Sequence, residues 1–442
     1  MQLTDQHIPW YQSRFEAFEQ GLNGTTSTSM HAIRRKAMQR FVDLGFPTAH
    51  QEEWRFTNIV PITQKEFQPI VRSEIKSATK IDIQPHLVEH AHHLVFLDGV
   101  YSPELSDISS FPAGTKVGSV AEQLKSHPEL ILPYINTMGE ENAFTLLNTA
   151  FLWDGAFLSV PKGVLLESPI QLLFLATDRA QLFAAQPRNI VIAGKASQFK
   201  IIETYAGLAE NTYLSNAVTE VVLGDHSIVE HDKMQKESMN AFHIGTTHVQ
   251  MSAASQYTSN VISLGGFIVR NNITARFEAE GAECILNGLS LGRDTQLIDN
   301  HTVIDHAVPH CNSHELYKSI LGGASKGVFN GKVFVRKDAQ KTDAKQTNKT
   351  LLLSDDATMH TKPQLEIFAD DVKCTHGATI GQLDEEQIFY LRSRGINLDA
   401  ARDILTSAFA NDVINRISID PLRRMVEHMI LDRLKKNHKT SA

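Results

Sequence analysis

The sequence predicts a mainly β protein in which a β-solenoid core lies between helical segments at the two ends of the chain. In residues 1–80 and 382–442, apolar side chains recur at steps of three and four, as on one face of a helix. In residues 81–381, short runs rich in Val, Ile, Thr, Phe and Tyr alternate with small-residue turns. We therefore expect three domains with these boundaries.

The N-terminal domain contains one clear helix, over residues 30–44, where apolar side chains form a single stripe. Gly45 follows at the position of a helix C-terminal glycine, and Pro47 prevents the helix from continuing. A second, shorter helical stretch begins at Thr48. This domain is therefore expected to be small and helical.

The central domain consists of short strands separated by small-residue turns. Five of the strand-like runs are 218–223, 257–264, 267–277, 328–335 and 364–368. The turns contain Lys195-Ala196, Asp225-His226, Ala253-Ala254, Gly281-Ala282, Gly323-Ala324, Asp338-Ala339, Asp356-Ala357 and Gly377-Ala378, whose second members are 30, 28, 28, 42, 15, 18 and 21 residues apart. Such quasi-regular spacing indicates stacked coils. An antiparallel β-sandwich is the alternative, although the tight Asn-Gly hairpins that it favours are scarce.

The C-terminal domain returns to helical periodicity from Asp384, and Gly395 marks a helix end. After Pro421, a stripe that includes Leu422, Val426 and Ile430 predicts an amphipathic helix. This stripe has two interpretations: it packs on the protein's own core, or it forms a docking surface for a partner.

Composition excludes several classes of protein. The 442 residues carry 42 Lys and Arg against 50 Asp and Glu, a formal net charge of −8, which argues against nucleic-acid binding. Three widely spaced cysteines exclude a disulfide framework and favour a reducing compartment. No segment approaches the roughly 20 apolar residues of a membrane span, and the first thirty residues do not resemble a signal peptide. We expect a cytoplasmic protein without a membrane segment.

Two patterns raise the question of metal binding. His86 to His90 (HLVEH) matches the HxxEH pattern of some zinc hydrolases, so a zinc-dependent hydrolase is one alternative. The densest cluster comprises His301, His306, His310, Cys311 and His314. If these residues lie on a strand, the side chains of His306, His310 and His314 share one face, whereas Cys311 points away. The cluster is either polar surface or a metal site, and its role stays open.

A third pattern, Lys373 to Gly377 (KCTHG), places Cys374 and His376 two residues apart. On a strand both side chains leave by the same face. Thiolate and imidazole are ligands that iron and iron–sulfur clusters accept, but two ligands do not complete a metal site. Further ligands would have to come from elsewhere in the chain or from a partner.

At these residues the sequence resembles a known family. Residues 351–396, with the motifs HGATIG and FYLRSRG, are similar to the C-terminal signature of the SufB/SufD family of iron–sulfur cluster assembly proteins. Segments 45–57, 310–318 and 328–347 agree with the same family. The segments GFPT and EEWRFT resemble its SufD branch more than its SufB branch.

The resemblance implies a right-handed parallel β-helix between helical domains, and a scaffold subunit without catalytic residues of its own. Such a subunit pairs with SufB and docks the ATPase SufC through its C-terminal helices, here about residues 384–429. His376 would face a transient iron–sulfur cluster at the interface with SufB, with Cys374 as an auxiliary group. A homodimer of the isolated chain and a flavin in the complex stay open. A carbohydrate-active β-helix enzyme is a further alternative, but it needs a groove of paired carboxylates and aromatic side chains.

Overall fold

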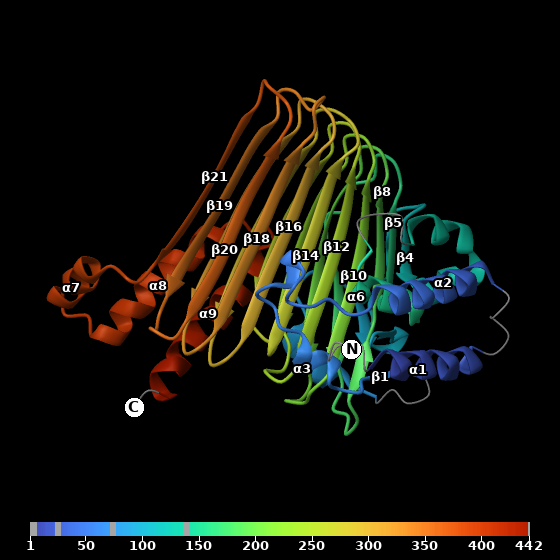
Figure 1. The fold of residues 1–442 in the computed structure, drawn as a ribbon, viewed down its shortest axis with the longest axis horizontal. Coiled ribbons are helices and arrows are strands. Elements are labelled where there is room, and N and C mark those ends of the chain that lie inside the picture. The colour runs from blue at the N-terminus through green and yellow to red at the C-terminus, as the bar shows by residue number, and fades with distance from the viewer. Residues whose placement is uncertain (1–6, 23–27, 71–76, 136–140, 441–442) are drawn as a thin grey trace.

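The computed structural model describes residues 7–22, 28–70, 77–135 and 141–440, and the side chains up to residue 434. Two long β-sheets face each other along most of the molecule (Figure 1). Sheet A contains, in spatial order, β4 (Lys116–Ser119), β5 (Ala156–Val160), β8 (Arg188–Ala193), β10 (Leu214–Leu223), β12 (Phe242–Met251), β14 (Ile268–Phe277), β16 (Leu297–His306), β18 (Lys326–Val335) and β20 (Thr358–Ile367), with β1 (Gln68–Pro69) and β7 (Phe183–Ala185) at its side. Sheet B contains β3 (Val100–Tyr101), β2 (His92–Leu97), β6 (Ile170–Ala176), β9 (Gln198–Gly207), β11 (Ile228–Lys236), β13 (Gln256–Ser263), β15 (Glu283–Gly292), β17 (Asn312–Leu321), β19 (Asp343–Leu352) and β21 (Lys373–Gly381).

From β8 onward the chain alternates between the two sheets, and each strand pairs in parallel with the strand two positions later. This connectivity is that of a β-solenoid, so the predicted fold class is confirmed and the β-sandwich alternative is wrong. The five strand-like runs predicted from the sequence lie in β10, β13, β14, β18 and β20, and three of them extend one residue beyond the strand.

The coil length is regular, although the predicted turns were unevenly spaced. On one side of the solenoid, the residues with positive φ are Ala196, His226, Ala254, Gly281, His310 and Lys341, at separations of 30, 28, 27, 29 and 31 residues. Gly323 lies in a turn on the opposite side, between β17 and β18. The uneven spacing read from the sequence therefore arose because turns from both sides were counted as one series. The turn predicted at Gly377-Ala378 is wrong, since both residues lie within β21.

Apolar side chains from both sheets fill the inside of the solenoid. Side chains at equivalent positions of successive coils stack on one another. Phe96 of β2, Phe174 of β6 and Tyr205 of β9 are register partners whose rings stack at centroid distances of 4.7 and 4.9 Å. Parallel, in-register coils place like side chains about 4.8 Å apart, which favours such ladders.

Helices from the N-terminal part cover the outer face of sheet A (Figure 1). They are α1 (Ile8–Gly21), α2 (Ser29–Leu44), α3 (Val60–Thr63) and α6 (Ala143–Ala150), whereas α4 (Lys80–Ile83) and α5 (Val120–Ser126) lie nearer the start of the solenoid. The predicted helix over 30–44 is confirmed as α2; Gly45 follows it with a φ of 69°, and its N–H donates to the carbonyl of Phe41. The stretch expected from Thr48 is a single 3₁₀ turn, η3 (Glu52–Trp54).

Residues 52–57, which we call the N-terminal strap, cross the outer face of sheet A. The guanidinium of Arg270 lies 3.7 Å from the centre of the Trp54 ring, and both residues are buried. Further along, the ring of Phe56 stacks on that of His360 at 4.1 Å, with 9° between the planes. The strap thus reaches from β14 to β20, the last strand of sheet A.

Polar contacts also hold the strap to the solenoid. His301 of β16 lies between two carboxylates, 2.9 Å from Asp299 and 3.0 Å from Glu53. Burial lowers the pKa of His301, but the charge of Asp299 and the hydrogen bonds to Asp299 and Glu53 together outweigh burial, so the net pKa is raised. Thr57 donates to Asp299 at 2.5 Å, and Asn330 donates to Glu53 at 3.0 Å.

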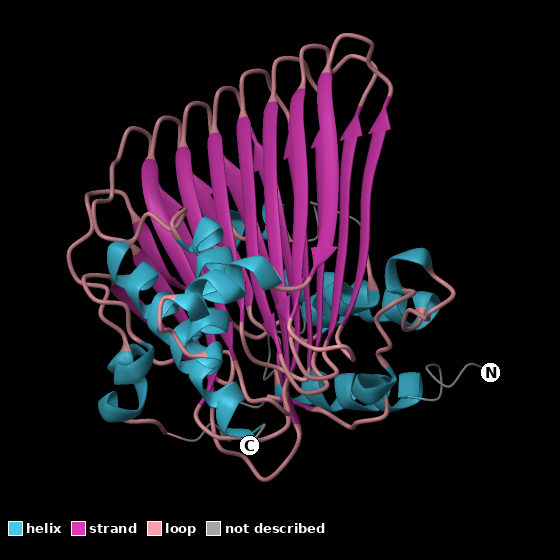
Figure 2. Cartoon of the chain, turned by 90° about the vertical axis from the view of Figure 1, so that its left-hand side faces the viewer, coloured by secondary structure: helices cyan, strands magenta, loops and turns pink. Residues whose placement is uncertain are grey.

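The C-terminal helices α7 (Glu385–Ser393), α8 (Leu398–Ile414) and α9 (Asp420–Thr440) lie on the side of sheet B (Figures 1 and 2). The predicted stripe of Leu422, Val426 and Ile430 is buried on α9 against the outer face of sheet B. Of its two interpretations, packing on the protein's own core is therefore the correct one. Within the described residues, no helix has both the length and the apolar character needed to cross a membrane.

Candidate functional site: the open end of the solenoid

The last coil leaves one end of the solenoid open. β20 and β21 are the outermost strands of their sheets, and within the described residues neither pairs with a further strand (Figure 1). Ile367, Phe368 and Ile380 at this end are 39, 59 and 47% exposed, so apolar groups accompany the free strand edges. Free edges of this length are a template for pairing with another chain.

His376 and Cys374 lie on β21 at this open end. Their register partners on β19 are Gln346 and Ala344, whose side chains are buried inside the solenoid. Because paired residues in a ladder share a face, Cys374 and His376 belong to the inward face of the last coil. His376 is nevertheless exposed, since no further coil covers it.

Cys374 differs from His376 in its surroundings. Its side chain is half-buried and packs against the apolar cluster that contains Val335, Ala344 and Ala369. Burial raises the pKa of the Cys374 thiol, so at neutral pH the sulfur is protonated. A protonated, half-covered thiol is a poor metal ligand, whereas the imidazole of His376 is open to solvent.

Two buried polar residues continue the row of His376 into the solenoid. Glu315 of β17 is the register partner of Gln346, and the Gln346 amide donates to the Glu315 carboxylate at 2.5 Å. Burial raises the pKa of Glu315 to about 7. Sequence reasoning missed both residues, although a signal exists: 315, 346 and 376 are 31 and 30 residues apart, which is one coil each time.

A second polar cluster lies deep inside the solenoid and contains Glu203, His231, Lys233, Glu237 and His243, all buried. His231 lies 3.2 Å from Glu203, and His243 lies 2.7 Å from Glu237. Burial raises the pKa of Glu203, but His231 and Lys233 outweigh burial and hold the pKa at about 2. The charges therefore compensate one another inside the protein.

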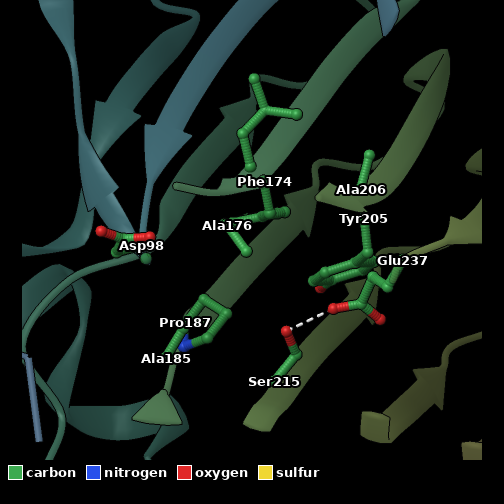
Figure 3. Close-up of a pocket in the computed structure, with 11 residues that line it drawn as sticks. Asp98, Phe174, Ala176, Ala185, Pro187, Tyr205, Ala206, Ser215 and Glu237 are labelled. Carbon is green, nitrogen blue, oxygen red and sulfur yellow. Dashed lines mark hydrogen bonds between the residues drawn. The ribbon is translucent and has the colours of Figure 1, made fainter. Parts of the chain in front are cut away.

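A small pocket adjoins this cluster (Figure 3). Tyr205 and Glu237 line it together with Asp98 and Ser215, and Ser215 donates to Glu237 at 2.5 Å. Even with the space that is open to solvent included, its volume of about 260 Å³ is below the range typical of ligand pockets. Since Glu237 is already bonded by Ser215, Gln235 and His243, this pocket offers little free polar chemistry.

The HLVEH segment does not form a zinc-binding helix. His86 ends the 3₁₀ turn η5 (Gln84–His86), Leu87 is extended, and His90 has a φ of 63° in the turn that leads to β2. Within the described residues, no group of three or more His, Cys, Asp or Glu side chains is placed to hold a metal ion. The geometry that the zinc hydrolase alternative requires is therefore absent from this segment.

The histidine cluster is dispersed by the fold. His301 points outward from β16 to the N-terminal strap, and His306, at the end of the same strand, is buried and bonded to Ser313 at 2.9 Å. His310 lies in a turn with a φ of 58°, and His314 lies on β17 in the other sheet. The expectation that His306, His310 and His314 share one strand face is wrong, because a turn between the sheets separates them.

The fold and the open end together define the class of this protein: a β-solenoid whose last coil has free strand edges and an exposed histidine. Comparison with known families places it further. The model described as "SUF system FeS cluster assembly, SufBD core domain" matches residues 174–409, and that of the "SufBD protein N-terminal region" matches residues 4–172. The chain belongs to the SufBD family of iron–sulfur cluster assembly proteins.

Several proteins of this family are similar in sequence to nearly the whole of this chain. An iron–sulfur cluster assembly SufBD family protein of Synechocystis is 33% identical over 91% of this chain and 90% of its own length. The iron–sulfur cluster assembly protein SufD of Escherichia coli is 29% identical over 90% of this chain and 91% of its own length. The iron–sulfur cluster assembly protein SufD of Bacillus subtilis is 25% identical over 91% of this chain and 93% of its own length. These relatives favour cluster assembly over the carbohydrate-active alternative.

Proposed function

We propose that this chain is a non-catalytic scaffold subunit that pairs through the open end of its solenoid with a SufB-type partner and presents His376 to a nascent iron–sulfur cluster at the shared interface. The observation that carries the proposal is the position of His376, exposed on the inward face of the unpaired strand β21. The cluster is the cargo of the assembly, held transiently and then released.

The chain has too few metal-ligating side chains at its open end to hold a cluster without a partner. Among the described residues of the open end, the exposed imidazole is that of His376, and the thiol of Cys374 is half-buried and protonated. An iron–sulfur cluster is usually held by four protein ligands, so the remaining ones must come from the partner. A single neutral imidazole is also a replaceable ligand, which suits a site from which the cluster must leave.

Strand edges and apolar groups give the partner a surface to occupy. β20 and β21 provide edges of ten and nine residues, flanked by Ile367, Phe368 and Ile380. A second β-solenoid that continues both sheets would satisfy the edges and bury these side chains. The contact would place His376 at the junction of the two molecules.

The C-terminal domain, residues 382–442, is the proposed docking site of the ATPase SufC. The stripe of α9 is used in packing on sheet B, so docking must use another surface. On α7, which projects away from the solenoid (Figure 1), Phe389 and Tyr390 are 74 and 57% exposed. ATP hydrolysis in the partner would then move the helices relative to the solenoid and open the interface.

Substitution of His376 tests the cluster site. We expect His376→Ala to leave the complex with SufB and SufC intact but to impair cluster formation, measured anaerobically by iron–sulfur absorption and by growth of cells that lack a parallel assembly system. His127→Ala, at an exposed histidine that follows α5, is the matched control and should behave as the wild type. Normal cluster supply in the His376→Ala complex would rule out the site.

A further inference from the structure

Gln346 occupies the position directly behind His376 in the solenoid. It is the register partner of His376 on one side and of Glu315 on the other. Neighbouring parallel strands lie about 4.8 Å apart, so the three side chains follow one another along the inward face of sheet B. Gln346 is 1% exposed and Glu315 is 4% exposed, so only His376 at the end of the row reaches solvent.

Glu315 determines how the Gln346 amide is oriented. The Nε2 group donates to the Glu315 carboxylate at 2.5 Å, which identifies that arm of the amide as the donor. The other arm, Oε1, is buried and has no hydrogen-bond partner among the described residues. A buried carbonyl oxygen without a partner is costly, by about 1–3 kcal/mol.

A glycine in sheet A leaves room for the side chain of Gln346. Gly331 of β18 faces the amide, and a Cβ atom at that position would lie 2.3 Å from Gln346 Nε2 and 2.7 Å from the Phe329 ring. Any side chain at residue 331 would therefore displace the amide. The glycine allows the Gln346 side chain to extend along the row.

We propose that Gln346, oriented by Glu315, is a positioning residue that accepts a hydrogen bond from one ring N–H of His376 and so presents the lone pair of the other ring nitrogen to iron. The inference rests on the proposed role of His376 as a cluster ligand. A histidine that binds a metal through one nitrogen is commonly held through the other, which fixes its tautomer and its ring orientation. Gln346 Oε1, which has no partner among the described residues and lies one strand away from His376, would be the acceptor for this second contact.

The tautomer of His376 in the isolated full chain tests the hydrogen bond without any cluster. With ¹⁵N-labelled histidine, the nitrogen shifts of neutral His376, assigned by their loss in His376→Gln, should show one dominant tautomer. Gln346→Met keeps the side-chain length but removes the acceptor, so His376 should revert to the mixture of an exposed imidazole. Asn348→Leu is the matched control: Asn348 is the next inward residue on β19, but it faces Ala378.

A second variant and a second measurement keep the proposal testable. Glu315→Gln preserves the shape of the carboxyl group but not its charge, so it should weaken the tautomer preference even if Gln346→Met folds poorly. In the complex, Gln346→Met should reduce cluster formation about ten- to hundredfold, the usual effect of losing a group that orients a ligand. An unchanged tautomer in both variants would overturn the inference. A changed tautomer with unchanged cluster formation would instead overturn the proposed role of His376.

Discussion

Glu315 is a carboxylic acid enclosed by the solenoid, and its pKa is raised from 4.5 to about 7 by burial. Between these two pH values the folded protein holds a proton that the unfolded chain releases, so stability falls as the pH rises and then levels off above pH 7. The penalty amounts to roughly 3 kcal/mol. We expect Glu315→Gln to remove it, and denaturant unfolding of both proteins from pH 4.5 to 8 measures the difference.

The stabilities of the wild type and of Glu315→Gln should differ in how they depend on pH. Relative to the variant, the wild type should lose stability as the pH rises from 4.5 to 7 and should lose no more above that range. Parallel pH profiles for the two proteins would show that the Glu315 carboxyl titrates normally in the fold. Because Glu315 lies one coil behind Gln346, the same variant links this measurement to the tautomer of His376.

The single residues of the site could be predicted only in part. The spacing of Cys374 and His376 predicts that they share a face on a strand, and a family resemblance singled them out from the other histidines. In the structure Cys374 packs into an apolar cluster, whereas His376 is exposed. This difference depends on tertiary packing, which cannot be predicted from the spacing of the two residues. Glu315 and Gln346 were missed because their relation to His376 is visible only when the coil length is known.

At the scale of elements, strands were predicted more reliably than their register. Alternating Val, Ile and Phe residues identify runs such as 267–277, which contains the whole of β14. The turn residues were also recognised, for example Ala254 with its φ of 52°. The side of the solenoid on which each turn lies could not be predicted, because a small residue permits a turn without specifying which strands it joins.

The exposed aromatic residues of α7 give a prediction for this element. In the double substitution Phe389→Ser and Tyr390→Ser, we expect the thermal unfolding midpoint to change little, because both side chains are largely exposed. Binding of the SufC ATPase should weaken at least tenfold, measured by calorimetry, if this surface is the docking site. Ile404→Ser on α8, 46% exposed in the wild type, shows whether the docking surface extends to the next helix.

Two outcomes of this experiment are decisive. If the double variant binds SufC with wild-type affinity, the docking site does not include α7. If it loses helical content, as seen by circular dichroism, the exposed residues support the domain itself. Ile388, which is 3% exposed on the same helix, holds α7 to its neighbours and must stay unchanged in the test.

At the scale of the whole molecule, the open end determines whether two solenoids can join. Ile380 lies on β21 with its side chain 47% exposed. We expect Ile380→Lys to leave the isolated chain folded but to prevent pairing with SufB, because a charge at a strand edge disfavours edge-to-edge association. Size-exclusion chromatography with light scattering measures the complex.

Ile81→Lys is the matched control for this prediction. Ile81 is 84% exposed on α4, a helix that does not belong to the open end, and its substitution should leave the complex unchanged. A stable complex formed by Ile380→Lys would contradict pairing through β21. The same measurement on the wild-type chain alone shows whether the open end also forms homodimers.

The N-terminal strap ties the beginning of the chain to its most distant strands. Glu52 contacts Lys362, 310 positions later, and Glu53 contacts Asn330, 277 positions later. During synthesis the strap's contacts with β18 and β20 therefore cannot form until nearly every coil has left the ribosome. Such high contact order slows folding and leaves the early segments waiting for their partners. The strap can dock completely only on a nearly finished solenoid, so its contact with β20 marks a chain that is ready to expose its open end to a partner.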